Sequence, residues 1–218
     1  MAEDDDAVTG DLQASFVDLQ WPVVGFLTAE HNTVTALRSA TVSETNGRAS
    51  AFLGVLSAAL VALGLVGGGG SFDDAFFGFA LVVLLVPTLV GVLTFGRCLQ
   101  ASVEDLRLAR RAERVRAAYL ELVPALALRL QPPADEDSSQ VRRAAGMTGR
   151  GRWQLALTLA GLVALVNSVL VGALAALGVR IATRAETAAV VLGVVLALLA
   201  AAVHTRMMVR AFDRDLRH

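Results

Sequence analysis

The stretch that decides the fold runs from Arg97 to Arg152 and reads RCLQASVEDLRLARRAERVRAAYLELVPALALRLQPPADEDSSQVRRAAGMTGRGR. It is polar, it holds eleven of the nineteen basic residues of the 218-residue chain, and it separates two pairs of long apolar runs. Because those runs are long enough to cross a bilayer, the arginines of this stretch indicate the side of the membrane on which it lies. The fold therefore follows from the runs and from the charge between them.

Four apolar runs predict four transmembrane helices. They cover residues 49–66, 76–95, 153–177 and 187–203. A helix needs about 20 residues to cross about 30 Å of hydrocarbon, because each residue adds about 1.5 Å. The links 67–75 and 178–186 are nine residues each, and links this short predict helical hairpins. The predicted fold class is an all-α membrane protein with two transmembrane hairpins.

Composition agrees with this class. Hydrophobic residues make up 55% of the chain and the mean hydropathy is +0.60, whereas about 45–50% is usual for soluble domains. The net charge of -1 predicts no general attraction to nucleic acid. All nineteen basic residues are arginine, a bias typical of a GC-rich bacterial gene, so we expect the bacterial inner (plasma) membrane.

The distribution of arginine predicts the orientation. If both termini and the central stretch are cytoplasmic, seventeen arginines lie inside and only Arg180 and Arg184 lie outside. Five segments follow from this topology. They are a cytoplasmic tail with amphipathic helices (1–48), a first hairpin (49–95), an Arg-rich cytoplasmic helix and linker (96–152), a second hairpin (153–209) and a cytoplasmic tail (210–218).

Within these segments the local pattern is informative. Residues 1–10 are acidic and predict a disordered tail, and Pro22 and Asn46-Gly47 predict breaks between one or two amphipathic helices. A heptad-like stripe predicts that the second span continues as a cytoplasmic helix, which Pro124 kinks or ends: Leu108, Ala112, Val115, Tyr119, Leu122 and Leu126. A shift of 110 residues superposes the two hairpins and their links, so a tandem duplication is one interpretation.

Small residues recur at every fourth position in three of the spans. The ridges are Ser50, Gly54, Ala58 and Ala62; Ala160, Ala164, Ser168, Gly172 and Ala176; and Ala189, Gly193, Ala197 and Ala201. Such ridges allow helix backbones to approach closely in lipid. The third-span ridge is a candidate packing face, either within one chain or between subunits.

Two further residues of the spans are candidates for packing or pore roles. Asn167 is the one strongly polar side chain near the middle of a span, where its amide either bonds between helices or lines a pore. Pro87 predicts a bend in the second span, static or hinge-like. The candidate pore or packing residues are therefore Asn167, Ser168, Ala164, Gly172 and Pro87.

No pattern of catalytic, metal-binding or cofactor-binding residues is found. His31, His204 and His218 lie far apart, and Gly67–Gly70 lacks the ending of a phosphate loop, so we expect neither an enzyme nor a cofactor. The arginines of the central helix are candidates for contact with an anionic ligand or with lipid, although they also fit a solvated helix face. These are Arg107, Arg110, Arg111 and Arg114.

Residues 28–130 resemble a known family in their arrangement. A helix ending in Glu44-Thr-Asn-Gly-Arg48-Ala, a hairpin with a short outer loop and a long helix continuing the second span are similar to the hairpin-membrane effectors of bacterial anti-phage systems, of the SLATT and Pycsar type. This resemblance implies an oligomeric effector that permeabilises the inner membrane when a nucleotide signal is sensed. The chain differs from that family in its second hairpin and in having no recognisable sensor domain.

Two functional hypotheses remain open. The first is a self-associating membrane effector or channel in antiviral defence, with the lipid bilayer and further copies of the chain as partners. The second is a non-conducting scaffold that recruits a cytoplasmic protein. A coupled transporter is less favoured, because no charged residue lies inside a predicted span.

Overall fold

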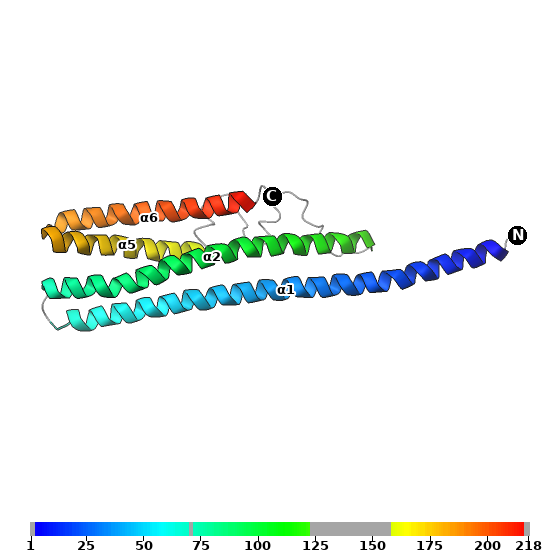
Figure 1. Cartoon of the computed structure of the whole chain (residues 1–218), viewed down its shortest axis with the longest axis horizontal. Helices are drawn as coiled ribbons and strands as arrows, with labels where there is room; N and C mark the ends of the chain where they lie inside the picture. The colour runs from blue at the N-terminus through cyan, green and yellow to red at the C-terminus, as the bar shows by residue number, and fades with distance from the viewer. Residues whose placement is uncertain (1–2, 70–71, 123–157, 216–218) are drawn as a thin grey trace. The chain divides into compact units, whose positions relative to one another are not determined.

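The computed structural model describes residues 3–69, 72–122 and 158–215, and all regular structure in these ranges is helical. The four helices of the described residues are α1 (Glu3–Gly67), α2 (Asp74–Leu122), α5 (Leu159–Thr183) and α6 (Glu186–Asp215) (Figure 1). By length and composition, each contains a window that could cross a membrane. The predicted all-helical class with four apolar helices is confirmed. Leu126, Pro124 and the predicted linker lie outside the described residues.

The chain divides into two compact units. Unit 1 comprises Met1–Ala40 with Leu106–Gly146, and unit 2 comprises Thr41–Asp105 with Met147–His218. Each of the long helices α1 and α2 contributes to both units, because the boundaries at 40 and 105 fall inside them. Each unit has its own set of buried side chains and is considered separately.

Unit 1 pairs the N-terminal part of α1 with the C-terminal part of α2 in antiparallel fashion. The hydroxyl groups of Thr28 and Tyr119 are 2.7 Å apart, and Arg111 Nε donates to Glu30 Oε1 at 2.5 Å. Leu108 and Val115 of the predicted stripe are buried, whereas Ala112, Tyr119 and Leu122 are half-buried. Two buried side chains of α2, Leu106 and Ala109, lie outside the predicted stripe, and Val34 of α1 is buried as well.

Unit 2 combines parts of α1 and α2 with all of α5 and α6. Helices α5 and α6 lie side by side and are joined only by Arg184 and Ala185 (Figure 1). Arg184 adopts the left-handed conformation with φ 56°, and its N–H donates to Arg180 O at 3.0 Å. This cap ends α5 and reverses the chain within two residues.

The helices of the structure begin and end at other residues than the predicted apolar runs. Helix α5 begins at Leu159 because Thr158 caps it: the Thr158 hydroxyl accepts from Gly161 N at 3.1 Å. The helix extends to Thr183, six residues beyond the predicted end, so the second link is two residues and not nine. The first link, between Gly67 and Asp74, is six residues. The equal links that motivated the interpretation as a tandem duplication are therefore not observed.

The expected helix breaks are also absent. Helix α1 runs from Glu3 through Pro22 and Gly47 without interruption, so residues 3–10 are helical instead of disordered. Helix α2 passes through Pro87 and continues to Leu122, as the heptad-like stripe predicted. Helix α6 extends to Asp215. One proline removes a single backbone hydrogen bond, and the remaining bonds keep the chain helical on both sides of it.

Candidate functional site

Asn167 of α5 is buried within unit 2. Its side chain is 0% exposed, and it faces Gly91 of α2 and Phe52 of α1. Neither Asn167 Oδ1 nor Nδ2 has a hydrogen-bond partner among the described residues. The predicted glue and pore-lining roles of Asn167 both remain predictions. Asn167 is also closer to the start of α5 than expected, eight residues after Leu159, because this helix begins and ends later than predicted.

Ser168 belongs to a buried polar contact between α5 and α6. Its hydroxyl donates to Ala164 O at 2.7 Å and lies 3.1 Å from His204 Nδ1. His204 Nδ1 is in turn 2.7 Å from Ala200 O, so this nitrogen carries the proton that the carbonyl accepts. The Phe95 ring packs edge-on against His204 at 4.5 Å between centroids. The sequence analysis missed His204, because residues 95, 168 and 204 are adjacent only in the folded unit.

The third-span ridge packs against the fourth-span ridge within the chain. A Cβ atom on Gly172 would lie 2.6 Å from Gly193 O and 2.7 Å from Ala197 Cβ. A Cβ atom on Gly193 would lie 2.8 Å from both Gly172 O and Ala176 Cβ. The two backbones approach this closely only because both positions are glycine. Of the other candidates, Ala164 is buried in α5, and Pro87 is buried in α2.

The first-span ridge, unlike the other two, lies mostly on the exposed surface of its helix. A heptad series of mostly small residues lies on the exposed surface of α1, opposite the buried Phe52 and Ala59, and we call it the α1 seam. Its members are Gly47, Ser50, Gly54, Ser57, Val61 and Gly64. A Cβ atom on Gly47, Gly54 or Gly64 would meet nothing within 4 Å. The sequence analysis recognised Ser50 and Gly54 but missed the steps of three and four that make this series a seam.

The predicted anionic contacts lie on α2 in unit 1. Arg107, Arg111 and Arg114 are exposed and share one helix face, whereas Arg110 is half-buried. Arg111 is held by Glu30, and Arg107 and Arg110 also have interaction partners. Arg116, on the same helix, lies 3.7 Å from Glu113. Whether the four arginines contact an anionic ligand or lipid remains a prediction.

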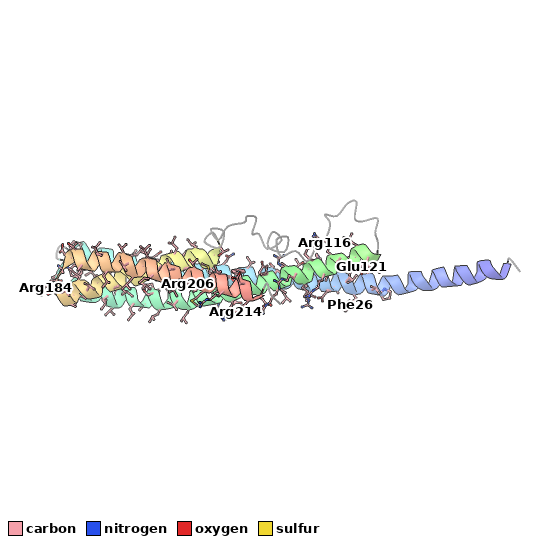
Figure 2. All side chains as sticks on the ribbon, turned by 90° about the horizontal axis from the view of Figure 1, so that it is seen from above. Phe26, Arg116, Glu121, Arg184, Arg206 and Arg214 are labelled. Carbon is pink, nitrogen blue, oxygen red and sulfur yellow. The ribbon has the colours of Figure 1, made fainter. Side chains whose placement is uncertain are left out.

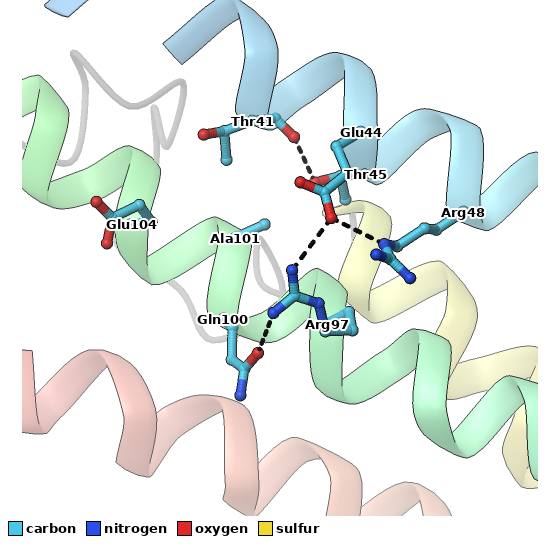
Figure 3. Close-up of a pocket in the computed structure, with 8 residues that line it drawn as sticks. All are labelled: Thr41, Glu44, Thr45, Arg48, Arg97, Gln100, Ala101 and Glu104. Carbon is cyan, nitrogen blue, oxygen red and sulfur yellow. Dashed lines mark hydrogen bonds and ion pairs between the residues drawn. The ribbon is translucent and has the colours of Figure 1, made fainter. Parts of the chain in front are cut away.

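A polar pocket of about 240 Å³ lies between α1 and α2 in unit 2 (Figure 3). Glu44 Oε1 accepts from Arg48 Nε at 2.9 Å and from Arg97 Nη2 at 3.1 Å, and Arg97 Nη1 donates to Gln100 Oε1 at 3.0 Å. Glu104 and the Thr41 side chain complete the opposite side. Hydrogen bonds from Arg48 and then from Arg97 hold the pKa of Glu44 below its ordinary value.

The other end of unit 2 carries a second set of ion pairs. Arg184 Nη2 lies 2.6 Å from Asp74 Oδ2, and Arg180 Nη2 lies 3.4 Å from Glu186 Oε1. The Arg180 guanidinium also stacks 5.0 Å above the centroid of the Phe77 ring. The two arginines predicted to lie on the outer side are therefore both paired with carboxylates, Arg184 with Asp74 at the start of α2 and Arg180 with Glu186 at the start of α6.

No cluster of three or more His, Cys, Asp or Glu side chains that could hold a metal ion occurs in the part of the chain that the structure describes. Cys98, the single cysteine of the sequence, is a buried free thiol. The site features of this protein are thus the buried polar contact of Ser168 with His204, the exposed α1 seam and the charged pocket.

No protein-family model, curated protein or solved structure gives a significant match to the chain.

Proposed function

We propose that the protein is a multi-pass inner-membrane protein that self-associates and acts as an effector or channel that permeabilises the membrane. The four apolar helices support membrane insertion. Within unit 2, Arg184 lies at the end with the α5–α6 link, and Arg206 and Arg214 lie toward the other end of α6 (Figure 2). This separation agrees with cytoplasmic termini, since arginine accumulates on the cytoplasmic side. Two helical hairpins with a cytoplasmic extension of α2 follow from this topology.

The observation that carries the proposal is the α1 seam. Glycine and serine on an exposed helix face contribute little to burial in lipid, but they allow a second helix to approach closely. Ridges of the same kind on α5 and α6 pack against each other, whereas the seam has no partner among the described residues of its own chain. A second α1 is therefore the occupant we propose for the seam, in a symmetric homo-oligomer.

Permeation in this proposal occurs between subunits. The polar side chain best suited to line a path within one chain, Asn167, is enclosed by Gly91 and Phe52. An assembly of α1 helices would instead place Ser50 and Ser57 of neighbouring subunits near one another. A nucleotide trigger and a role in anti-phage defence rest only on the resemblance of residues 28–130 to membrane effectors.

Disulfide cross-linking tests the seam. In a Cys98→Ser background, we expect Ser57→Cys to form dimers on oxidation in membranes, because equivalent seam residues of two facing α1 helices lie close together. Val55→Cys is the matched control: it is exposed on the same helix at the same depth but lies outside the seam. Equal cross-linking of the two variants would contradict a specific seam.

Dye release from liposomes tests the link between assembly and permeation. Gly54→Val adds bulk to the seam and should lower cross-linking and dye release together, whereas Val55→Leu should change neither. Release that persists after assembly is lost would overturn permeation between subunits. Assembly of the wild-type chain without any release would favour the scaffold instead.

The scaffold is the second candidate because of unit 1. Its helix pair has a buried apolar core and is held by Glu30–Arg111 and Thr28–Tyr119 contacts. Such a pair is a rigid surface on which a cytoplasmic partner protein could dock without any conduction through the membrane. Co-purification of a defined partner that depends on exposed Phe26, together with absence of dye release, would favour this function.

A further inference from the structure

The pocket between α1 and α2 in unit 2 lies where the sequence changes from polar to apolar. Arg48 directly precedes the first apolar run, and Arg97 follows the second run by two residues. If these runs cross the bilayer, as the proposed function requires, the two arginines lie at the level of the lipid headgroups of the cytoplasmic leaflet. We infer that Arg48 and Arg97 bind the phosphodiester group of an anionic phospholipid.

One carboxylate holds the two guanidinium groups close together (Figure 3). Glu44 Oε1 accepts from Arg48 Nε at 2.9 Å and from Arg97 Nη2 at 3.1 Å. Because both nitrogens bond to the same oxygen atom, a single phosphate group in the pocket can reach both arginines. Glu44 also offsets the repulsion between the two positive charges, so the pair is already in place before a ligand binds.

Most N–H donors of this pair have no partner among the described residues. Each guanidinium has five N–H groups, whereas Arg48 donates only to Glu44, and Arg97 only to Glu44 and Gln100. About half of each arginine side chain is exposed, 50% for Arg48 and 53% for Arg97, so a ligand can approach both. Arginine binds phosphate through paired N–H groups, whose planar arrangement matches two phosphate oxygens.

The charge of this pair favours an anion. Arg48 and Arg97 carry two positive charges and Glu44 carries one negative charge, so one positive charge is in excess. Glu104, on the other side of the pocket, bonds to neither arginine and has an interaction partner of its own. A singly charged anionic headgroup compensates the excess charge, whereas a choline headgroup would bring another positive charge toward the two guanidinium groups.

The surroundings of the pocket favour a lipid over a soluble phosphate compound. Leu93 precedes Arg97 by about one helical turn, so the two residues share one face of α2, and Leu93 is 71% exposed. An acyl chain can lie along this face while the phosphate bonds to Arg97. The pocket measures about 240 Å³, less than the about 300–1,000 Å³ of pockets for drug-sized ligands, so it suits a headgroup.

Lipid retention provides the test. The full-length protein is reconstituted in vesicles of equal parts dioleoyl phosphatidylcholine and dioleoyl phosphatidylglycerol and released in mild detergent, and its bound lipid is measured by native mass spectrometry. A hydrogen bond between charged groups is typically worth enough to change an equilibrium about tenfold. We expect about tenfold enrichment of phosphatidylglycerol over phosphatidylcholine, and equal retention of the two lipids would overturn the site.

Two variants with opposite expected effects assign the enrichment to the arginine pair. Arg48→Gln removes one guanidinium group and should abolish most of the enrichment. Glu44→Gln removes the competing negative charge but keeps an oxygen that can accept from the arginines, so it should raise the enrichment. A purely structural role of the contact predicts a loss in both variants. That result, or no change in either variant, would overturn the site.

Arg184→Gln is the control for these variants. It changes the charge of the protein as much as Arg48→Gln does, but at an exposed ion pair at the other end of unit 2. It should leave the enrichment of phosphatidylglycerol unchanged. A loss equal to that of Arg48→Gln would show a general attraction of arginine for anionic lipid, which contradicts a specific site.

Two further measurements separate the remaining outcomes. Glycerophosphoglycerol carries the same phosphodiester without acyl chains. If it binds at millimolar concentration to the wild-type protein but not to Arg48→Gln, and no lipid is enriched, the ligand is soluble and the lipid assignment is overturned. Failure of the protein to float with vesicles on a density gradient would overturn both this site and the proposed function, whereas flotation without lipid enrichment overturns the lipid site alone.

Discussion

At the scale of single residues, the contact between Asn167 and Gly91 is the most constrained point of unit 2. An amide with no partner among the described residues costs about 1–3 kcal/mol. Asn167 Oδ1 lies too close to the Cβ position of Gly91 for a side chain to fit there, so the Gly91 Cα–H group points toward this oxygen. A weak Cα–H···O contact offsets part of the cost, and it requires glycine at position 91.

We predict that Gly91→Ala destabilises the protein by about 1–3 kcal/mol, the usual cost of overpacking a core. The added methyl group would collide with Asn167 Oδ1 and lie 2.9 Å from the Phe52 ring. The measurement is loss of helical circular dichroism on titration with denaturing detergent in mixed micelles.

Gly78→Ala is the control for this variant. Gly78 lies on the same helix as Gly91, and a Cβ atom on Gly78 would meet nothing within 4 Å. It should be neutral or stabilising by about 0.5–1 kcal/mol. The double variant Gly91→Ala/Asn167→Ala should recover stability relative to Gly91→Ala, since it removes both the collision and the unpaired amide. No recovery would show that the two residues are not coupled as the packing implies.

At the scale of elements, small residues determine which helices meet. The backbones of α5 and α6 approach closely at Gly172 and Gly193, and only two residues join these helices. In lipid, where burial of apolar surface gives no drive to association, this close approach is a main source of helix pairing. The ridge of α5 therefore acts within the chain.

We predict that Gly172→Ala weakens the α5–α6 contact by about 1–3 kcal/mol. Its methyl group would lie 2.6 Å from a backbone oxygen, which cannot move aside as a flexible side chain can. The same detergent titration measures the effect. Gly178→Ala, also in α5 and free of close neighbours, should cause no loss. If Gly172→Ala leaves monomer stability unchanged but dissociates the oligomer, the contact within the chain is not the one that matters.

At the scale of the whole molecule, the arginine distribution predicts the topology. Seventeen arginines fall on one side of the four predicted spans, and the other two form ion pairs at the α5–α6 link. We expect both termini and the segment around Ser138, which lies outside the described residues, to face the cytoplasm.

Cysteine labelling in intact cells measures this topology. In a Cys98→Ser background, Ser138→Cys should be protected from a membrane-impermeant maleimide until the cells are permeabilised. Phe72→Cys, in the link between α1 and α2, should react in intact cells because Phe72 is exposed there. The reverse labelling pattern would invert the topology and move the charged pocket to the outer leaflet.

The local sequence was sufficient for the helical class, the four apolar helices and the continuation of α2 to Leu122. These features depend on apolar run length and heptad spacing, which neighbouring residues alone define. Helix ends were predicted less well, because a single side-chain cap such as Thr158 shifts a boundary by several residues in an apolar run that has no other signal.

The site depended on contacts between distant segments. Three ridges look alike in the sequence, yet those of α5 and α6 are buried against each other and that of α1 is exposed, because a ridge is defined by the helix that packs on it. His204 and the Arg48–Arg97 pocket were missed for the same reason: their partners are 36 and 53 residues away along the chain. Sequence spacing shows which residues share one face of a helix, whereas only the tertiary structure shows which other helix packs on that face.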